Sequence, residues 1–191
     1  DITNTGTVSG ATLGINAGTI GGSGNIKVTN TGTVSGGSGG IVTSQSGTGN
    51  TEAIIDGTVT GTNTTSDGVE NIISGTSSTG NITVTQNSGT ITGGTNGINS
   101  LNDGTGSTNI TVAGVVTGGT GAGINTLDND TTTSPTDNFT TVTLNSGAVV
   151  SATSGVALTN DEGDSLTTVN SGAAVQGKVI LGEGNDNLVI N

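Results

Sequence analysis

Acidic side chains are the residues of this 191-residue chain whose type and spacing could bind a ligand. They gather at Asp161-Glu162-Gly163-Asp164 and at Asp128-Asn129-Asp130, in stretches that lack apolar alternation and are expected to be loops. Carboxylate and amide oxygens are the ligands that calcium takes. Asp161 and Asp164 are therefore candidate calcium ligands, weighed against the commoner outcome of a solvated acidic loop.

A third candidate calcium ligand is Asp186, which lies in the phrase GEGNDNLV at residues 182–189. This phrase fits most of the calcium-binding nonapeptide G-G-x-G-x-D-x-U-x, with Leu181 in place of the first glycine. Calcium rolls hold each ion between successive copies of the nonapeptide. The equivalent internal segments carry Ile26 and Thr51 where Asp186 stands, so no second carboxylate is supplied. We therefore expect no resident metal or other cofactor.

The composition argues against catalysis. The chain has no cysteine and no histidine, its only cations are Lys27 and Lys178, and its only aromatic residue is Phe139. Glycoside hydrolysis needs paired carboxylates, whereas the acidic residues here are scattered through loops. A lyase would need a cation to stabilise the developing anion. We expect no enzymatic activity and assign no catalytic residue.

The net charge of −12 limits the partners. Affinity for nucleic acid depends on Lys and Arg that neutralise phosphate, so nucleic acid is excluded as a partner. Docking on anionic lipid is excluded on the same ground. No apolar run approaches the roughly 20 residues that span a bilayer, so we expect no membrane insertion by this segment.

A repeated phrase organises the chain. The pattern Asn-Ser/Thr-Gly followed by Thr-Val or a similar pair recurs along the sequence, with anchoring glycines 25 to 33 residues apart. A Gly-Ile or Gly-Val pair follows most anchoring glycines, and an alternating Ile-x-Val segment opens most units. This regularity is that of a repeat protein. The recurrent corner residues are Asn4, Asn30, Asn87, Asn145 and Asn170, with Gly6, Gly32, Gly89, Gly147 and Gly172.

Each unit reads as three short strands, which predicts an all-β, single-stranded parallel β-helix of about seven turns. We expect it to be right-handed, as parallel crossovers are, and about 34 Å long at one strand spacing per turn. Alternation should direct Ile and Val inward and Thr, Ser or Lys outward. The corner Gly and Asn are predicted to take positive φ, and the Asn side chains to bond to the backbone and stack as a ladder. Length varies after the third strand, as in Thr43–Asn50, Ile73–Asn81 and Asp128–Asn138, where the only proline, Pro135, lies.

The two ends of the chain read as unfinished turns. The segment Asn187–Asn191 resembles the opening strand of an eighth turn, and the first strand begins at Ile2 without a preceding cap. We expect one continuous solenoid domain over residues 1–191 whose uncapped edges would pair with further strands. Those strands would belong either to a longer rod or to another copy of the chain, which makes the chain its own expected partner.

The repeats, together with the phrase VILGEGNDNLVIN at residues 179–191, resemble the passenger β-helix of Gram-negative autotransporters and related large surface adhesins. The resemblance covers essentially the whole chain. It implies a right-handed, three-sided solenoid that is extracellular, either secreted or held at the bacterial surface through a region outside these residues. It leaves open host or surface ligands. Apart from Phe139 the chain has no aromatic residue, and it has no globular insert, so the resemblance implies no particular passenger activity.

The leading functional hypothesis is a structural rod, the stalk or body of an autotransporter-type adhesin. The alternative is a subunit that stacks end to end into an extracellular fibre or matrix. A lesser alternative is an ice- or surface-binding face, because the outward positions of the second strands would form two Thr/Ser ranks that resemble those of β-solenoid antifreeze proteins. These positions are Thr7 and Ser9, Thr33 and Ser35, Thr58 and Thr60, Thr90 and Thr92, then Val115 and Thr117.

Overall fold

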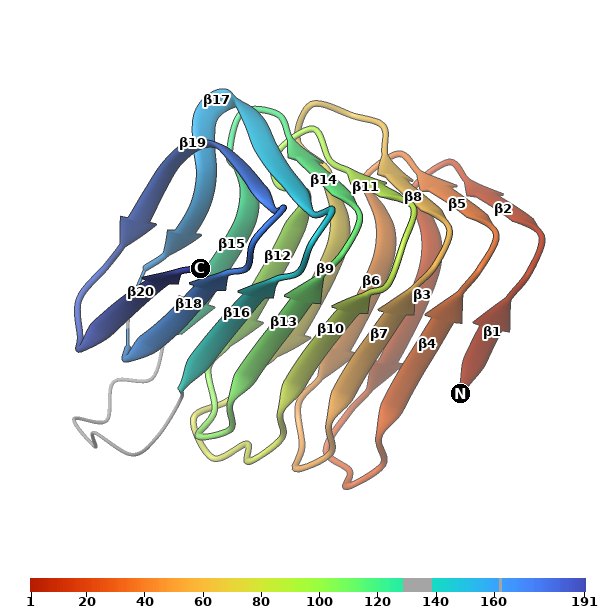
Figure 1. Cartoon of the computed structure of the whole chain (residues 1–191). Helices are drawn as coiled ribbons and strands as arrows, with labels where there is room; N and C mark the ends of the chain where they lie inside the picture. The colour runs from red at the N-terminus through yellow and green to blue at the C-terminus, as the bar shows by residue number, and fades with distance from the viewer. Residues whose placement is uncertain (129–138, 162) are drawn as a thin grey trace.

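The computed structural model describes residues 1–128, 139–161 and 163–191, and within them it contains twenty β-strands and no helix (Figure 1). The predicted insertion at 129–138, with Pro135, lies outside the described residues. The strands are β1 (Ile2–Asn4), β2 (Thr7–Gly10), β3 (Leu13–Thr19), β4 (Ile26–Asn30), β5 (Thr33–Gly36), β6 (Gly39–Gln45), β7 (Thr51–Ile55), β8 (Thr58–Gly61), β9 (Asp67–Ile73), β10 (Ile82–Gln86), β11 (Thr90–Thr92), β12 (Ile98–Asn102), β13 (Thr108–Val112), β14 (Val115–Gly118), β15 (Ala122–Asp128), β16 (Thr140–Leu144), β17 (Val149–Asn160), β18 (Ser165–Val169), β19 (Ala174–Leu181) and β20 (Asp186–Ile190).

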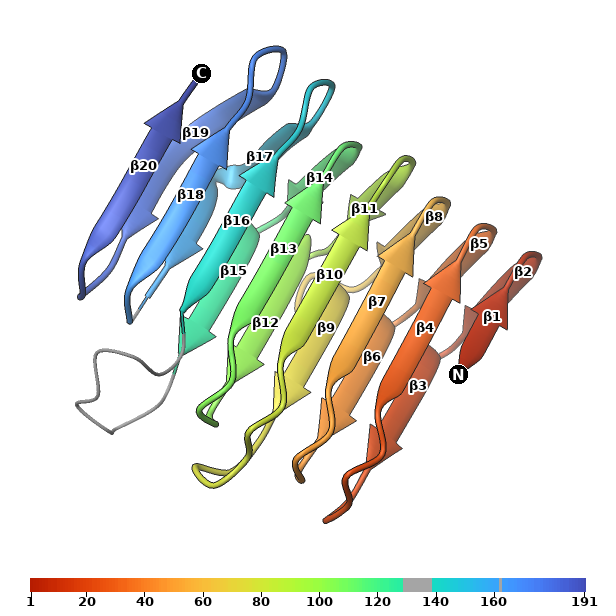
Figure 2. The same cartoon turned by 60° about the horizontal axis from the view of Figure 1, so that its bottom comes forward.

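All pairings between these strands are parallel, and each strand pairs with its equivalent in the next turn. The opening strands form an eight-stranded sheet in the order β1-β4-β7-β10-β13-β16-β18-β20, which faces the viewer in Figure 2. The second and third strands of each turn form a twelve-stranded sheet, because β17 and β19 run through both positions. The chain is therefore a parallel β-solenoid, as predicted. β20 pairs with β18 as the opening strand of an eighth turn.

The core is a thin stack of aliphatic side chains. Alternation along the opening strands places Val28, Ala53, Val84, Ile110 and Val142 in one column in which each is at most 1% exposed. The second strands add a single inward column, and the third strands add a column that begins at the predicted Gly-Ile pair. Burial comes from stacking between neighbouring turns, which is how solenoids are stabilised.

The predicted inward and outward assignment is wrong for the second half of the third strands. Ile41 faces inward, so strict alternation also turns Thr43 and Gln45 inward, and both are buried. The same parity turns Leu101 and Leu127 outward, where each is half-buried. The anchoring Ile fixes the phase of the strand, and that phase overrides the hydropathy of the residues after it.

In the first five turns the corner between the second and third strands begins at a glycine, namely Gly10, Gly36, Gly61, Gly93 and Gly118. A Cβ built on Gly36 would lie 2.0 Å from the Gly39 oxygen and 2.4 Å from the Gly14 nitrogen, so no side chain fits there. In the last turns the two strands join instead into β17 and β19, which curve over the corner in Figure 1. Gly155, with φ of 83°, takes the bend within β17. The three separate strands predicted for each unit are therefore two in these turns.

Candidate functional site

The first repeated site is the corner between the opening and second strands, where Asn4 and Asn30 lie at equivalent inward positions. The Asn4 Nδ2 donates to Asn30 Oδ1 at 2.8 Å and to the Gly6 oxygen at 3.2 Å. The Asn30 Nδ2 donates to the Gly32 oxygen at 3.2 Å and to the Thr58 oxygen at 3.3 Å. Each amide thus closes its own corner and reaches the next turn.

The other predicted corner asparagines occupy a different position. Asn87, Asn145 and Asn170 each follow the last inward residue of the opening strand, one place later than Asn4 and Asn30. The Asn170 Nδ2 donates to Asn145 Oδ1 at 3.2 Å, and the Asn191 Nδ2 donates to Asn170 Oδ1 at 3.0 Å. The structure therefore has two short ladders where the sequence suggested one.

Corner length explains the shift. Two residues join the strands after Asn4 and Asn30, whereas four residues, Asn145–Ala148, join β16 to β17. In that longer corner the Ala148 nitrogen donates to the Asn145 oxygen at 2.9 Å, so the backbone closes its own turn. A corner that closes itself does not need an inward amide, and the inward residue there is Leu144.

Gln86 shows the same rule at an intermediate length. Three residues follow it before β11, and its Nε2 donates to the Gly89 oxygen at 3.2 Å and to the Val115 oxygen at 3.1 Å. These acceptors are equivalent to those of Asn30. Because glutamine is one methylene longer than asparagine, it spans a corner that is one residue longer.

The predicted corner glycines have two separate physical roles. A Cβ on Gly32 would lie 2.0 Å from the Gly6 oxygen, so Gly32 is needed for close approach between turns. Gly147 and Gly172 have φ of 89° and 86°, so their role is the predicted positive φ. Gly89 combines both roles, because its φ is 79° and its Cβ would lie 2.0 Å from the Gly57 oxygen. Gly6 has neither constraint, because nothing lies within 4 Å of its Cβ position.

A further ladder, which precedes the opening strands β4, β7 and β10, was not predicted from the sequence. The Asn50 nitrogen donates to Asn25 Oδ1 at 2.9 Å, the Asn81 nitrogen to Asn50 Oδ1 at 2.8 Å, and the Ser107 nitrogen to Asn81 Oδ1 at 2.7 Å. The signal for it is the Gly-Asn pair at residues 24–25, 49–50 and 80–81. Each side chain thus holds the backbone of the following turn in register.

The calcium candidates lie near this ladder at the C-terminal end. Asp164 takes the ladder position, since its Oδ1 accepts from the Asn185 nitrogen at 2.8 Å and from Asn185 Nδ2 at 3.2 Å. Asp186 Oδ1 accepts from Ser165 Oγ at 2.6 Å. Asp161 contributes its backbone oxygen, which accepts from the Glu183 nitrogen at 3.3 Å. Across residues 1–128, 139–161 and 163–191, no three metal-ligating side chains come together; Asn129, Asp130 and Glu162 lie outside these ranges.

We expect Asp164→Asn to change the free energy of unfolding by less than about 0.5 kcal/mol, because the amide oxygen can accept the same bond from Asn185. Asp164→Ala should lower it by about 1 kcal/mol, since the Asn185 N–H loses its acceptor. Denaturant titrations with and without calcium chloride measure both. A calcium-dependent rise in stability that Asp164→Asn abolishes would show instead that this carboxylate binds calcium.

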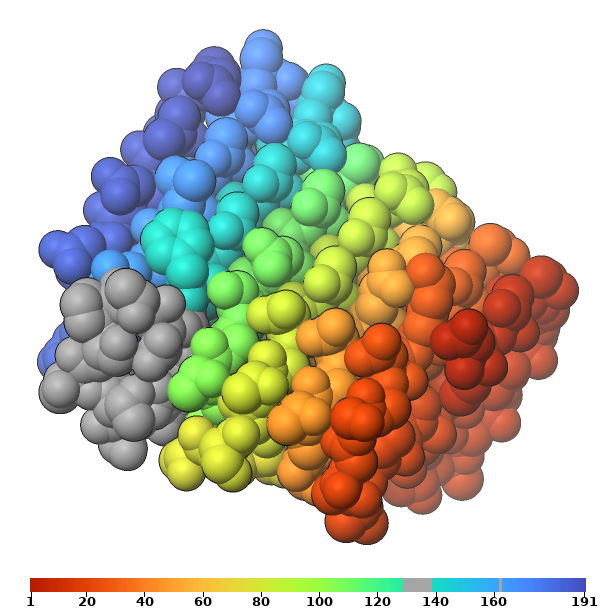
Figure 3. Space-filling model, turned by 90° about the horizontal axis from the view of Figure 1, so that it is seen from below, coloured from red at the N-terminus to blue at the C-terminus, as the bar shows by residue number. Residues whose placement is uncertain are grey.

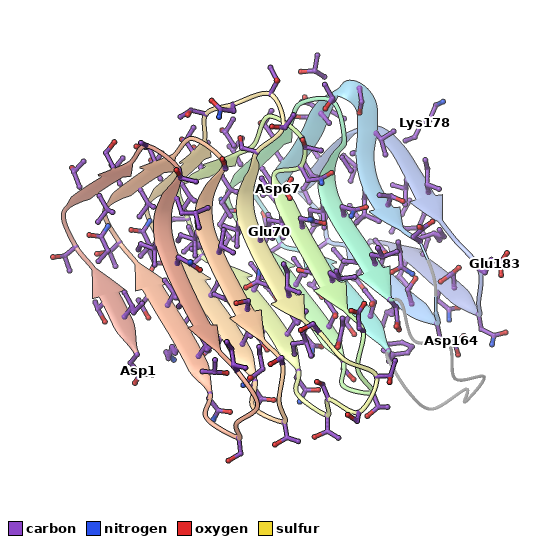
Figure 4. The ribbon with its side chains drawn as sticks, turned by 180° about the vertical axis from the view of Figure 1, so that it is seen from behind. Asp1, Asp67, Glu70, Asp164, Lys178 and Glu183 are labelled. Carbon is purple, nitrogen blue, oxygen red and sulfur yellow. The ribbon has the colours of Figure 1, made fainter. Side chains whose placement is uncertain are left out.

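A second acidic cluster lies at the start of β9, where Figure 4 labels Asp67 and Glu70. Asp67 Oδ1 accepts from the Asn96 nitrogen at 2.9 Å and from Asn96 Nδ2 at 3.1 Å, and its Oδ2 accepts from Asn99 Nδ2 at 2.8 Å. The ladder continues with a 2.8 Å bond from Asn125 Nδ2 to Asn99 Oδ1. Two amides of the following turn thus bind the Asp67 carboxylate.

Burial raises the pKa of both carboxyl groups. For Asp67 it raises the pKa above the ordinary 3.8, although the hydrogen bonds from Asn96 and Asn99 oppose the rise. For Glu70 burial, and then the charge of Asp67, raises the pKa above the ordinary 4.5. The folded protein therefore binds these protons more tightly than the unfolded chain. It follows that both groups reduce stability as pH rises from their ordinary pKa through the raised folded value.

We expect Glu70→Gln to raise the thermal unfolding midpoint at neutral pH and to flatten its decline as the pH rises above the ordinary carboxyl pKa of 4.5. The reason is that the variant removes a partly buried charge beside Asp67. Glu52→Gln is the matched control, since Glu52 forms an ion pair with Lys27 at 2.9 Å on the surface. It should leave the midpoint unchanged or slightly lower. A Glu70→Gln midpoint that falls at neutral pH would contradict the electrostatic argument.

The outward Thr/Ser positions of the second strands do lie in two ranks. Strand register aligns Thr7, Thr33, Thr58 and Thr90 in one rank, and it aligns Ser9, Ser35, Thr60 and Thr92 in the other. The first rank continues with Val115, Val149 and Ala174, and the second with Thr117, Ser151 and Gln176. Both ranks therefore carry hydroxyl groups over the first four turns. In the fifth turn the first rank loses its hydroxyl, because Val115 stands there.

The surface of the molecule consists of ridges that follow the turns (Figure 3). One hollow of about 320 Å³ lies over the opening strands, between Asp1, Lys27, Glu52 and Thr83. Another of about 240 Å³ lies between Asn96, Asn125, Thr159 and Ile180 on the third strands. Both are lined by ladder residues whose polar groups serve neighbouring turns.

Comparisons with known proteins assign no family. No family model matches the chain, and no curated protein and no solved structure matches it either. In the part of the chain that the structure describes, no helix is long and apolar enough to cross a membrane. The class that the fold defines is the parallel β-solenoid.

Proposed function

We propose that the chain is a structural, non-enzymatic rod segment of an extracellular or cell-surface protein. The observation that supports this is the repetition of one bonding pattern in turn after turn. Backbone pairing, amide ladders and stacked aliphatic columns all run along the same axis. Such a structure provides length and stiffness, and it does not bring reactive side chains together around a substrate. The resemblance of the sequence repeats to those of autotransporter passengers supports a role as the stalk or body of a bacterial adhesin.

The second candidate is end-to-end assembly with other copies of the chain into a fibre or matrix. It is favoured by the location of exposed apolar side chains. Ile190 is 73% exposed and Leu188 43% exposed on β20, Ile180 is 44% exposed on β19, and Ile2 is 37% exposed on β1. Strands stacked on these edges, from the same polypeptide or from another copy, would cover them.

The mass of the intact native polypeptide, measured with electron microscopy of the same preparation, tests both candidates. Single rods of fixed length from a much longer polypeptide would support the stalk. A polypeptide near 18.1 kDa in filaments of indefinite length would support assembly. Short monomers of that mass would contradict both. Protease accessibility on intact cells tests the proposed surface location.

An ice- or surface-binding role for the Thr/Ser ranks is a third candidate, favoured by their strict register. Thermal hysteresis and ice-crystal shaping at high protein concentration test it. Since Thr is also a good exposed strand residue, the absence of both effects would leave the ranks with a purely structural role.

A further inference from the structure

The third strands contain a buried polar column inside the solenoid. Register places five polar side chains at the inward position two residues after the anchoring Ile or its equivalent, and each is at most 1% exposed. The middle inward column of the opening strands and the inward column of the second strands are mainly aliphatic, whereas the first inward position of the opening strands also carries buried hydroxyl groups, at Thr51, Thr108, Thr140 and Ser165. Since burying an unpaired polar group costs free energy, each member of this column must find a partner. The members are Thr43, Asn71, Ser100, Thr126 and Asn160.

Two threonines of the column bond in the same direction along the axis. The Thr43 hydroxyl donates to Asn71 Oδ1 at 2.7 Å, and the Thr126 hydroxyl donates to Asn160 Oδ1 at 2.7 Å. Each asparagine therefore uses its oxygen toward the preceding turn. Its Nδ2, which carries two hydrogens, is left for the following turn.

Asn71 Nδ2 and Ser100 Oγ are both fully buried atoms, and neither has a hydrogen-bond partner among the described residues. Asn71 and Ser100 are register partners on β9 and β12. Beyond Ser100, Thr126 directs its hydroxyl away toward Asn160. The two unpaired groups therefore lie on register-paired residues of adjacent strands, yet no hydrogen bond joins them. One water that bonds to both would satisfy the two groups.

We propose that Asn71 and Ser100 form an internal water-binding site that completes the polar column. The water accepts a hydrogen bond from Asn71 Nδ2 and exchanges another with Ser100 Oγ, so that the column is bonded from Thr43 to Ser100.

Asn160 provides an internal contrast. Its Nδ2 is also buried and without a partner in the described part of the chain, but its register partner in the next turn is Leu181. An aliphatic side chain cannot bond to a bridging water. The geometry therefore favours the pair Asn71 and Ser100 over the corresponding place at Asn160.

A crystal structure of the unmodified protein that resolves ordered waters is the first test. It should show one water within hydrogen-bond distance of both Asn71 Nδ2 and Ser100 Oγ. If the space between these atoms is dry, the proposal is wrong. This outcome does not depend on any variant folding.

A double-mutant cycle of thermal midpoints is the second test. Ser100→Ala should lower the midpoint by about 2–4 °C, because it leaves the water and Asn71 short of a partner. Asn71→Leu combined with Ser100→Ala should cost less than the sum of the two single changes, because the Asn71 amide and the Ser100 hydroxyl are then both absent. The Thr43 hydroxyl loses its acceptor in the Asn71→Leu variant and in the double variant alike, so that cost cancels in the cycle. Ser38→Ala, which removes a hydroxyl from an exposed corner, is the control and should have no effect. A Ser100→Ala midpoint that stays the same or rises, or strictly additive changes, would overturn the proposal.

Discussion

Gly32→Ala is expected to lower the free energy of unfolding by on the order of 3 kcal/mol. The added Cβ would lie 2.0 Å from the Gly6 oxygen and 2.9 Å from the Gly6 nitrogen, and both are backbone atoms. Neither can move aside as a side-chain end could. The Thr33 nitrogen also donates to this same oxygen at 2.8 Å, so relief of the clash would stretch a bond between the turns. Denaturant titration monitored by circular dichroism measures the loss.

Gly6→Ala is the matched control. Gly6 stands at the equivalent corner of the first turn, in the same Asn-Thr-Gly-Thr-Val context, and nothing lies within 4 Å of its Cβ position. In the 191-residue chain the change should cost less than about 0.5 kcal/mol. Equal losses at Gly6 and Gly32 would contradict the close-approach argument.

The same pair of variants reports on what lies beyond β1. If a further turn stacks on this edge in the native protein, its corner backbone would meet Gly6 as Gly6 meets Gly32. Gly6→Ala would then become as damaging as Gly32→Ala. The comparison thus tests the rod and fibre proposals with a stability measurement, independently of microscopy.

The solenoid could be predicted from sequence because its markers repeat at the same structural positions. The Gly-Ile pair at Gly40-Ile41 places Ile41 in the core, and the pair at Gly97-Ile98 does the same for Ile98. The Ile-x-Val segments become opening strands such as β4 and β10. Each marker contains an apolar residue that faces the core next to residues that the backbone needs at a corner or in a strand. Such a local pattern can be recognised without any knowledge of tertiary contacts.

The corner asparagines could not be aligned correctly because the phrase Asn-Ser/Thr-Gly occurs in two structural frames. In Asn30-Thr31-Gly32 the Asn points inward, whereas in Asn145-Ser146-Gly147 it follows an inward Leu144. The difference is the number of corner residues before the next strand, and only the strand pairing fixes that number. An inward amide bonds the two-residue corners after Asn4 and Asn30, whereas Ile55 and Val112 take the same inward position at other two-residue corners. A self-closing turn replaces the amide in the four-residue corner after Leu144.

The polar column of the third strands was also beyond reach, for a different reason. A residue such as Asn71 between Val69 and Ile73 has the hydropathy of an exposed position, yet the parity of β9 turns it inward. The free-energy cost of burying Asn71 is offset by its hydrogen bond from the Thr43 hydroxyl, which lies 28 residues earlier in the chain. A partner at that distance cannot be seen in a local pattern.

Leu188→Pro is expected to abolish the continuation of the solenoid beyond β20 while the turns before it remain folded. The Asn191 nitrogen donates to the Val169 oxygen at 3.0 Å, so alternation turns the N–H groups of Leu188 and Ile190 away from β18 and toward the free edge. Proline removes one of these outward donors and places its ring where the next strand would pair. The bonds between β20 and β18 stay intact, so the circular dichroism spectrum should be retained.

The readout depends on which strand covers this edge, and the two proposals predict different changes. Filaments built from separate copies should shorten to single particles, whereas a continuous rod should gain a protease-sensitive break at residue 188. Leu188→Ala is the control, because it removes apolar contact but keeps the N–H, and it should weaken stacking without preventing it. Filaments or rods of unchanged length with Leu188→Pro would mean that β20 does not take part in the axial contact. The exposed Leu188, Val189 and Ile190 would then need a different partner.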